Sequence, residues 1–174
     1  MILLQTSFSI FFIIIGLLFG VWNRWKEHYP TLLFWIIGNF LYGTLLNHYR
    51  VWEYHPVGID KIIFPTHTII GLKIAFLTYP FIIPIFLGRL PKLFFFKILW
   101  IIFWALLFEG VEFIAYITKS ITYNYGWSML WSFGFNLVTY TLLTIHHWKP
   151  WIAWSLSFIT MIILLIIFQP PIPK

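Results

Sequence analysis

The sequence predicts an all-α protein, a polytopic transmembrane bundle of about six helices that forms one integral membrane domain over residues 1–174. Hydrophobic residues make up 61% of the chain and charged residues 9%, whereas roughly a quarter of an ordinary soluble domain is charged. So few charges could not cover a surface that faces water. The second observation is a series of apolar runs of about 20 residues, the length that a helix needs to cross the hydrocarbon core.

The apolar runs define the expected helices, because the backbone groups of a segment in lipid must bond within that segment. The connections between the runs are short and rich in aromatic and charged residues, which favour the headgroup layer. Aromatic residues at the ends of the runs, such as Trp52 and Trp127, are therefore interpreted as interfacial anchors without a binding role. The six runs cover residues 3–22, 31–49, 68–87, 93–117, 127–146 and 151–168.

The first run is expected to be retained as a helix. It has no basic residue before it and is followed at once by Arg24 and Lys26, which is the reverse of the charge order in a cleaved signal peptide. Its Gly16 and Gly20 form a GxxxG pattern, which permits close approach of helices. This pattern predicts either packing inside the bundle or helix-mediated self-association of two copies.

Two prolines, Pro80 and Pro84, fall inside the third run. Proline removes a backbone donor and bends a helix, and neighbouring helices can pair the freed carbonyl groups. We therefore expect a structural kink at this point, with a gating hinge as the alternative.

The net charge of +6 does not indicate nucleic acid, because the basic residues are scattered between apolar runs. They are interpreted as topology signals and as contacts to anionic membrane lipids. With the N-terminus outside, the inner connections carry more basic residues than the outer segments, as the positive-inside rule requires. We expect a bacterial cell (plasma) membrane protein in this orientation. The inner set is Arg24, Lys26, Arg89, Lys92, Lys97 and Lys149, and the outer set is Arg50, Lys61, Lys119 and Lys174.

Three charged residues fall inside the expected spans: Lys73 in the third, and Glu109 and Glu112 in the fourth. A charge near the bilayer centre costs at least about 2.5 kcal/mol on insertion scales, so these side chains should face the bundle interior or one another. The two carboxylates share one face of a helix, which Tyr116 continues. Because they repel each other in a low dielectric, a cation should compensate them or one should hold a proton.

Counting residues from the span centres places these charges at one membrane depth. Glu109 lies about 6 Å beyond the middle of the fourth span, and Lys73 lies about 6 Å before the middle of the third. Because adjacent spans run antiparallel, both positions belong to the same leaflet, and the short connection at 88–92 makes the two helices neighbours. The same count brings four further polar residues to this side or to the middle of the spans: Asn39, His48, His67 and Asn136.

Together these residues form a candidate site for binding or relay, and three interpretations of it stay open. The first is a buried ion pair between Lys73 and Glu109 or Glu112 that locks two helices together. The second adds a water-filled pocket or a relay that opens to one face. A metal site is the third and weakest, because the chain lacks the Glu-x-x-His pairs of a helical di-iron centre; no metal is expected, and its candidate ligands would be Glu109, Glu112, His48 and His67.

Motifs for known catalytic chemistry are missing from the sequence. It contains no G-x-S-x-G, H-E-x-x-H or P-loop pattern. The absence of cysteine excludes disulfides, thiolate metal sites and thiol nucleophiles. No cofactor is therefore predicted, and no residue is identified as catalytic.

Several short motifs are spread along the chain: Tyr29-Pro30, Asn39 with Tyr42, Trp52-x-Tyr54, Glu112, and Tyr125-Gly126-Trp127. Through these motifs the chain resembles an uncharacterised family of small multi-pass membrane proteins from low-GC Gram-positive bacteria. The resemblance extends over most of the chain and implies the membrane class, but the family has no assigned activity.

Three functions remain in view. The first is a non-enzymatic bundle whose Lys/Glu cluster binds or relays a small solute, a proton or an ion. The second is a membrane-embedded enzyme that acts on a lipid or an isoprenoid-like substrate. The third is a structural or sensing membrane subunit that works through helix contacts, for which a sealed contact between Lys73 and a carboxylate, without a cavity, is expected.

Overall fold

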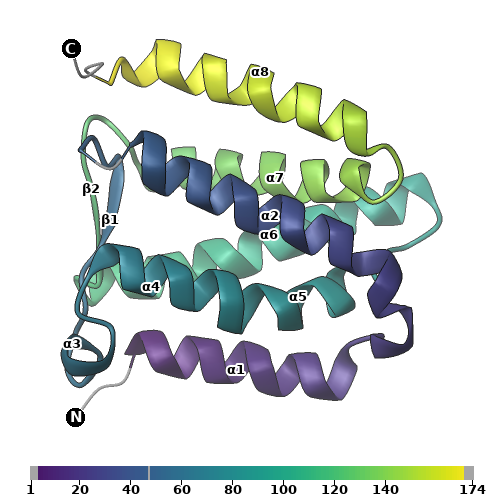
Figure 1. Cartoon of the computed structure of the whole chain (residues 1–174), viewed down its shortest axis with the longest axis horizontal. Coiled ribbons are helices and arrows are strands. Elements are labelled where there is room, and N and C mark those ends of the chain that lie inside the picture. The colour runs from purple at the N-terminus through teal and green to yellow at the C-terminus, as the bar shows by residue number, and fades with distance from the viewer. Residues whose placement is uncertain (1–3, 47, 171–174) are drawn as a thin grey trace.

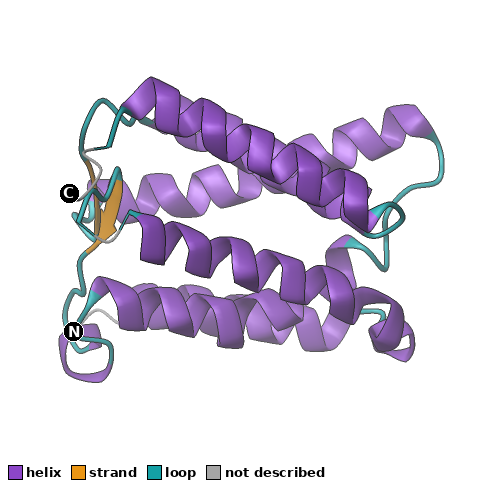
Figure 2. Cartoon of the chain, turned by 45° about the horizontal axis from the view of Figure 1, so that its top comes forward, coloured by secondary structure: helices purple, strands orange, loops and turns teal. Residues whose placement is uncertain are grey.

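The computed structural model describes residues 4–46 and 48–170 and shows a bundle of helices (Figure 1). The chain passes back and forth between the two ends of the bundle, and both termini lie at the same end, beside a short pair of strands (Figures 1 and 2). The all-α class is therefore confirmed. Residue 3, where the first run was expected to begin, and Lys174 lie outside the described residues.

The first two helices are joined by a tight turn. Helix α1 (Leu4–Phe19) leads into the 3-10 turn η1 (Trp22–Arg24), and α2 (Trp25–Leu45) follows at a bend of 90°. Helix α2 begins six residues before the expected run and ends four residues before its end. The early start has a local cause: Arg24 and Glu27 form an ion pair of 2.5 Å at the first turn, so the helix extends beyond its apolar part.

The third run forms a continuous but irregular helix. It consists of α4 (His67–Lys73), a π-helical turn η2 (Ile74–Thr78) and α5 (Tyr79–Phe86). The π turn comes directly before Pro80, which lies in the first turn of α5, where a missing backbone donor is tolerated. The helix is therefore irregular at the prolines through a π turn, while His67–Phe86 forms one continuous stretch; the kink and the gating hinge stay predictions.

The remaining runs form regular helices whose ends lie within two residues of the expected ones. They are α6 (Phe94–Ile117), α7 (Met129–His146) and α8 (Pro150–Phe168). Helix α7 begins after Ser128, whose hydroxyl accepts a hydrogen bond from Trp131 N at 3.5 Å, and α8 has Pro150 in its first turn. Both are ordinary signals for the start of a helix.

A two-stranded antiparallel ribbon closes one end of the bundle, where the sequence predicted only loops. Strand β1 (Trp52–Tyr54) pairs with β2 (Ile121–Tyr123), with Glu53 opposite Thr122. The short helix α3 (Asp60–Ile63) lies at the same end. Each strand has three residues, too few for an alternating pattern, and the partners are far apart in the sequence, so local patterns could not predict the pair.

The bundle packs around aromatic and β-branched side chains. Helix α5 packs against α1 and α2, while α7 packs against α2, α6 and α8. Phe86, Trp104 and Tyr140 are fully buried, with ring centroids 4.9 Å apart between Phe86 and Tyr140. At the α1–α5 contact, a Cβ atom on Gly16 would lie 2.4 Å from Phe81 Cβ, so the first glycine of the GxxxG pattern is used inside this chain.

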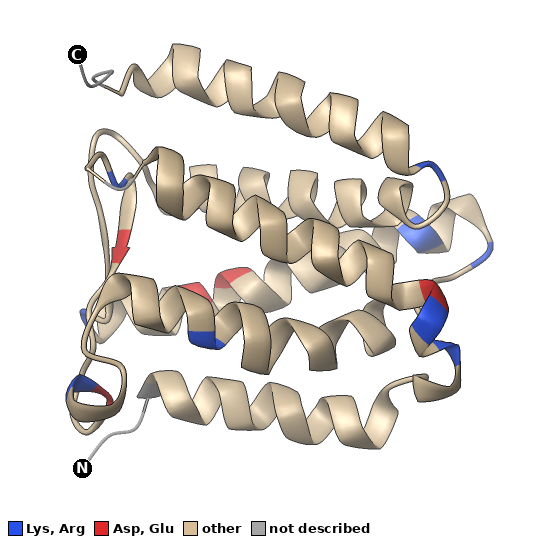
Figure 3. Cartoon of the chain, in the orientation of Figure 1, with Lys and Arg blue, Asp and Glu red and all other residues tan. Residues whose placement is uncertain are grey.

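The outer surface of the bundle is apolar. Within residues 4–46 and 48–170, three helical stretches are apolar enough and long enough to cross a membrane, namely His67–Phe86, Phe94–Ile117 and Pro150–Phe168. In the window of Pro150–Phe168 only 6% of the residues are buried, although its mean hydropathy is 2.4. Lys and Arg lie mainly on the turns at the two ends (Figure 3). A surface of this kind is consistent with a membrane protein.

Candidate functional site

A cavity of about 370 Å³ lies between the helices, towards the end that the ribbon closes. Both Lys73 of α4 and Glu112 of α6 line it. Its volume is in the range of small-molecule sites, and most of its lining is apolar or aromatic, as in such sites. Leu45 of α2 and Phe158 of α8 also line it and are half-exposed on the outer surface, so the cavity opens sideways between these helices.

Glu112 is held in place by hydrogen bonds to one of its two oxygens. Tyr123 OH donates to Glu112 Oε1 at 2.8 Å, and Ser132 Oγ donates to the same oxygen at 2.5 Å. Trp127 Nε1 donates in turn to Ser132 Oγ at 2.7 Å. Within the described part of the chain, Glu112 Oε2 accepts no hydrogen bond. One oxygen is therefore fixed, and the other is free to meet an occupant.

The ribbon contributes directly to this arrangement through Tyr123 of β2. Burial, and after it the Glu112 carboxylate, raises the pKa of Tyr123. The phenol therefore stays protonated at neutral pH and can donate its one proton to Glu112 Oε1 or to Met129 Sδ, which lies 2.7 Å from the phenol oxygen. This contact could not be predicted from the sequence, because the contact depends on how β2 crosses the end of α6.

An aromatic wall adjoins the carboxylate. Trp52 stacks on Tyr42 with ring centroids 3.9 Å apart, and it lies 4.9 Å from Trp127 and 5.5 Å from Phe135. All four rings line the cavity. The prediction that Trp52 and Trp127 are interfacial anchors without a further role is therefore incomplete, because both of them shape the cavity.

Glu109 lies one helical turn from Glu112, on the side of α6 that faces α7. Asn136 Nδ2 donates to its Oε2 at 3.3 Å, and Oε1 is buried without a partner in the described residues. Glu109 is not among the residues that line the cavity. The sequence brought Glu109 and Asn136 to a similar depth, and the structure brings them into contact.

Lys73 does not pair with either glutamate. Its ammonium group donates to the backbone oxygen of Gln5 at 2.7 Å and lies 4.9 Å from the centroid of the Phe64 ring. Ion pairs in the described residues join Arg24 with Glu27 and Arg50 with Glu53. The expected ion pair from Lys73 to Glu109 or Glu112 is therefore absent, and so is the sealed contact that a purely structural role required. The carboxylate whose charge acts on Lys73 belongs to Asp60.

Asp60 and Gln5 surround Lys73 at the edge of the candidate site, and the sequence did not reveal either of them. Asp60 is fully buried and accepts hydrogen bonds from Gln5 N at 3.0 Å and from the hydroxyl of Thr6, so it caps the start of α1 from another element. The side chain of Gln5 donates to the backbone oxygen of His55 at 2.9 Å. Asp60 lies in a loop between two runs, where an acidic residue is ordinary, so its position carried no signal.

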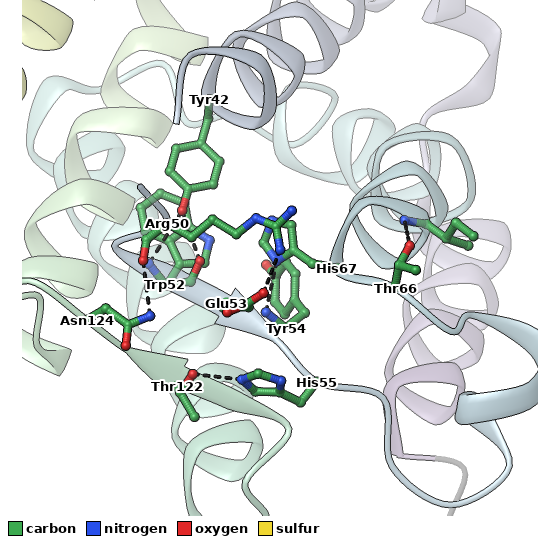
Figure 4. A network of polar contacts seen from close by, with 11 residues as sticks. Tyr42, Arg50, Trp52, Glu53, Tyr54, His55, Thr66, His67, Thr122 and Asn124 are labelled. Carbon is green, nitrogen blue, oxygen red and sulfur yellow. Dashed lines mark hydrogen bonds and ion pairs between the residues drawn. The ribbon is translucent and has the colours of Figure 1, made fainter. Parts of the chain in front are cut away.

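Of the two candidate histidines, His67 belongs to the network of polar contacts at the ribbon end (Figure 4). His67 Nδ1 accepts a hydrogen bond from Tyr54 N at 2.9 Å, which ties β1 to α4. His48 is exposed and borders a second, shallower pocket of about 150 Å³ with Arg50 and Glu53. Among residues 4–46 and 48–170, no group of three or more His, Asp or Glu could hold a metal ion.

The two remaining candidates, Asn39 and Tyr116, lie towards the end of the bundle that the ribbon closes, but they differ in their roles. Asn39 lines the cavity and donates to the backbone oxygen of Gly71 at 3.4 Å, which joins α2 to α4. Tyr116 is exposed and stacks on Tyr123, with ring centroids 5.1 Å apart. Tyr116 therefore supports the donor of Glu112 and does not itself reach the cavity.

Comparisons of this chain with family models, with characterised proteins and with solved structures found no match. The resemblance to a family of small bacterial membrane proteins stays a prediction. Any function must therefore be argued from the cavity and its side chains.

Proposed function

We propose that this chain is a multi-pass membrane protein that binds a small molecule in its intramembrane cavity. The observation that carries the proposal is the cavity of about 370 Å³, lined by Lys73 and Glu112 within a bundle whose outer surface is apolar. Charged side chains are costly in lipid and are retained mainly where they contact one another, backbone carbonyl groups or an occupant. Lys73 already contacts the backbone oxygen of Gln5, whereas Glu112 forms no ion pair in the described residues, which leaves an occupant of the cavity as the partner of Glu112.

The proposal includes six membrane crossings with the N-terminus outside. In its support, six helical segments pass between the ends of the bundle: α1, α2, α4–α5, α6, α7 and α8. The six basic residues of the expected inner set lie in or beside the turns at the end opposite the termini, which is the distribution that the positive-inside rule associates with the cytoplasm. We propose the cell membrane as the location and membrane lipids as the surrounding partners.

Labelling of single cysteines tests the cavity, because the chain contains no cysteine of its own. Thr139 lines the cavity from α7, and Ile163 is half-exposed on the outer face of α8. In detergent-purified protein, Thr139→Cys should react with N-ethylmaleimide, since a wet cavity permits thiolate formation. Ile163→Cys should react slowly, because its thiol lies in hydrocarbon, where the thiolate is disfavoured.

A panel of small amphipathic cations, anions and neutral compounds should then contain members that slow the labelling of Thr139→Cys. The same compounds should leave Ile163→Cys unchanged, which controls for effects on the micelle. If Thr139→Cys does not react, or if its rate is the same with every compound, the cavity is not a binding site and the proposal fails.

The sideways opening favours a second candidate function, a membrane-embedded enzyme that acts on a lipid. Glu112 lies beside a cavity that Leu45 and Phe158 open to the bilayer, so an acyl or isoprenoid chain can reach the carboxylate. Incubation of the protein with bacterial lipids, followed by mass spectrometry, should then reveal a product that Glu112→Gln does not form. If wild type and variant leave the same lipids unchanged, this candidate is excluded.

A further inference from the structure

The balance of charge around the cavity identifies the class of its occupant. We infer that the cavity binds a hydrophobic organic cation, with the Glu112 carboxylate as the counter-charge and the rings of Trp52, Trp127 and Phe135 around the apolar body. This inference rests on the proposed binding function and specifies its ligand.

The positive charge that faces the cavity is already held by contacts within the fold. The ammonium group of Lys73 donates to Gln5 O at 2.7 Å and lies over the ring of Phe64 at 4.9 Å. The negative charge that acts on it is that of Asp60, which is itself fixed by the start of α1. An anionic ligand at Lys73 would compete with contacts that the fold already makes.

The negative charge has no such partner. Glu112 Oε1 receives hydrogen bonds from two neutral donors, Tyr123 and Ser132, and in the described residues neither Glu109 nor Glu112 forms an ion pair. Two carboxylates one turn apart in a low dielectric are stabilised when one of them holds a proton or when a cation binds beside them. Since only Glu112 of these two lines the cavity, it is the residue that a bound cation meets.

The neighbouring surface suits an organic cation better than a metal ion. Trp52, Trp127 and Phe135 lie within 6.0 Å of one another by ring centroids, and aromatic faces attract cations whose hydration is weak. A hard metal cation requires about six or more oxygen ligands, whereas apolar and aromatic residues dominate here. The half-exposed Leu45 and Phe158 at the rim allow a ligand with an apolar body to enter from the bilayer.

The test compares two ions of the same shape and opposite charge. Binding of radiolabelled tetraphenylphosphonium and of tetraphenylborate to the detergent-purified protein is measured by equilibrium dialysis. The phosphonium should bind saturably, at about one per chain, and the borate should bind at least about tenfold more weakly, as expected for a buried charge pair. This comparison uses the wild-type chain and does not depend on any variant being folded.

Variants then locate the site. Glu112→Gln should weaken phosphonium binding at least about tenfold, because the counter-charge is lost. Glu109→Gln is the matched control on the same helix and should weaken binding by no more than a few fold. Trp52→Leu should weaken it roughly fivefold through the loss of an aromatic face.

The outcomes separate the two proposals. If the borate binds as tightly as the phosphonium, or if folded Glu112→Gln binds as wild type does, the cation inference is overturned while a binding cavity stands. If neither ion binds, the cation inference also fails. The binding function fails with it only when every compound of the panel leaves the labelling of Thr139→Cys unchanged.

Discussion

At the scale of single residues, Asp60 stands out because two elements depend on it. Its carboxylate accepts hydrogen bonds from Gln5 N and from Thr6 at the start of α1, and its charge acts on Lys73 of α4. The backbone oxygen of Gln5 accepts the hydrogen bond from Lys73. A buried carboxylate with these contacts fixes α1 against α4 and thereby fixes one side of the cavity.

Double-mutant cycles test this arrangement. Asp60→Asn and Lys73→Met should be coupled by at least about 0.5 kcal/mol in the free energy of unfolding, because each substitution removes a charge that acts on the other residue. Glu109→Gln and Lys73→Met are the matched pair and should be additive within about 0.5 kcal/mol, since the two residues do not touch. Unfolding in detergent of the single and double variants measures both couplings. Strong coupling of Lys73 to Glu109 with none to Asp60 would contradict the structure.

The same residues show what the sequence could predict about the site and what it could not. Counting along the helices predicted the membrane depth of Lys73, Glu109 and Glu112. In the structure, Lys73 and Glu112 line the same cavity. Depth is a position along the helix axis only. Which residues meet also depends on the rotation of each helix and on the neighbours that packing gives it. That is why the sequence matched Lys73 with Glu109, although Lys73 contacts Gln5 and its nearest acting negative charge is that of Asp60.

His147, at the turn between α7 and α8, provides a prediction about pH. Burial, and after it the positive charge of Arg24, lowers the pKa of His147 in the folded protein. The unfolded chain, with an ordinary histidine pKa of about 6.5, binds the proton first as pH falls. The contribution to stability is therefore complete above that pH and is lost as pH falls through the lower pKa of the folded state.

The unfolding temperature of the wild type should thus decrease between pH 7.5 and pH 5, and the decrease should be smaller for His147→Gln. The neighbouring His28 remains in both proteins, with its ring centroid 5.8 Å from that of His147, so the difference between the two curves reports His147 together with its interaction with His28. Parallel curves for the two proteins would contradict the lowered pKa.

At the scale of elements, the contact between α1 and α5 depends on a glycine. A Cβ atom on Gly16 would lie 2.4 Å from Phe81 Cβ and 2.6 Å from Phe81 O. Gly16→Ala should therefore destabilise the protein by about 1–3 kcal/mol, as overpacking does. Gly43→Ala in α2 is the control, because a Cβ atom there meets nothing within 4 Å, and it should be neutral or slightly stabilising. Thermal unfolding of both variants measures the difference; equal stabilities would show that the helices are not in close contact.

Self-association through Gly16 and Gly20 stays a separate prediction. Because Gly16 already packs against α5, two copies could meet through this face only by displacing that helix. The sequence pattern predicted close approach of helices and could not specify the partner, since GxxxG describes one surface only.

The helices themselves were predictable from the sequence, and the ribbon was not. Apolar runs of about 20 residues located α6, α7 and α8 within two residues, since hydropathy alone indicates where a helix in lipid begins and ends. The ribbon joins two segments that are far apart in the sequence, and Asn124 N donates a hydrogen bond to Val51 O at 2.8 Å beside it. No local pattern marks such a pair, yet it places Tyr123 at Glu112 and Trp52 at the cavity.

At the scale of the whole molecule, two features support a membrane protein. The outer surface is apolar, and each long helix runs from one end of the bundle to the other. Three helical stretches qualify as membrane spans by length and composition, and α1 with α2 qualifies as one bent pair. Helix α7 carries Ser132, Asn136 and Thr139 towards the cavity, and these polar residues lower its hydropathy. A segment that lines a site inside a bundle is therefore less apolar than one that faces lipid, although both run the full length of the bundle.

Six crossings predict that the two ends of the bundle lie on opposite sides of the membrane. Lys61 in α3 and Lys92 in the turn before α6 are exposed and lie at opposite ends. In intact bacterial cells that express the single-cysteine variants, a membrane-impermeant maleimide should label Lys61→Cys and should label Lys92→Cys only after the membrane is opened. The reverse pattern would keep the six crossings and invert the orientation, which the basic residues set. Labelling of both positions in intact cells would mean that the chain does not cross the bilayer between them. The cavity would then lie outside the membrane, and the lipid-side entry proposed for its ligand would be lost.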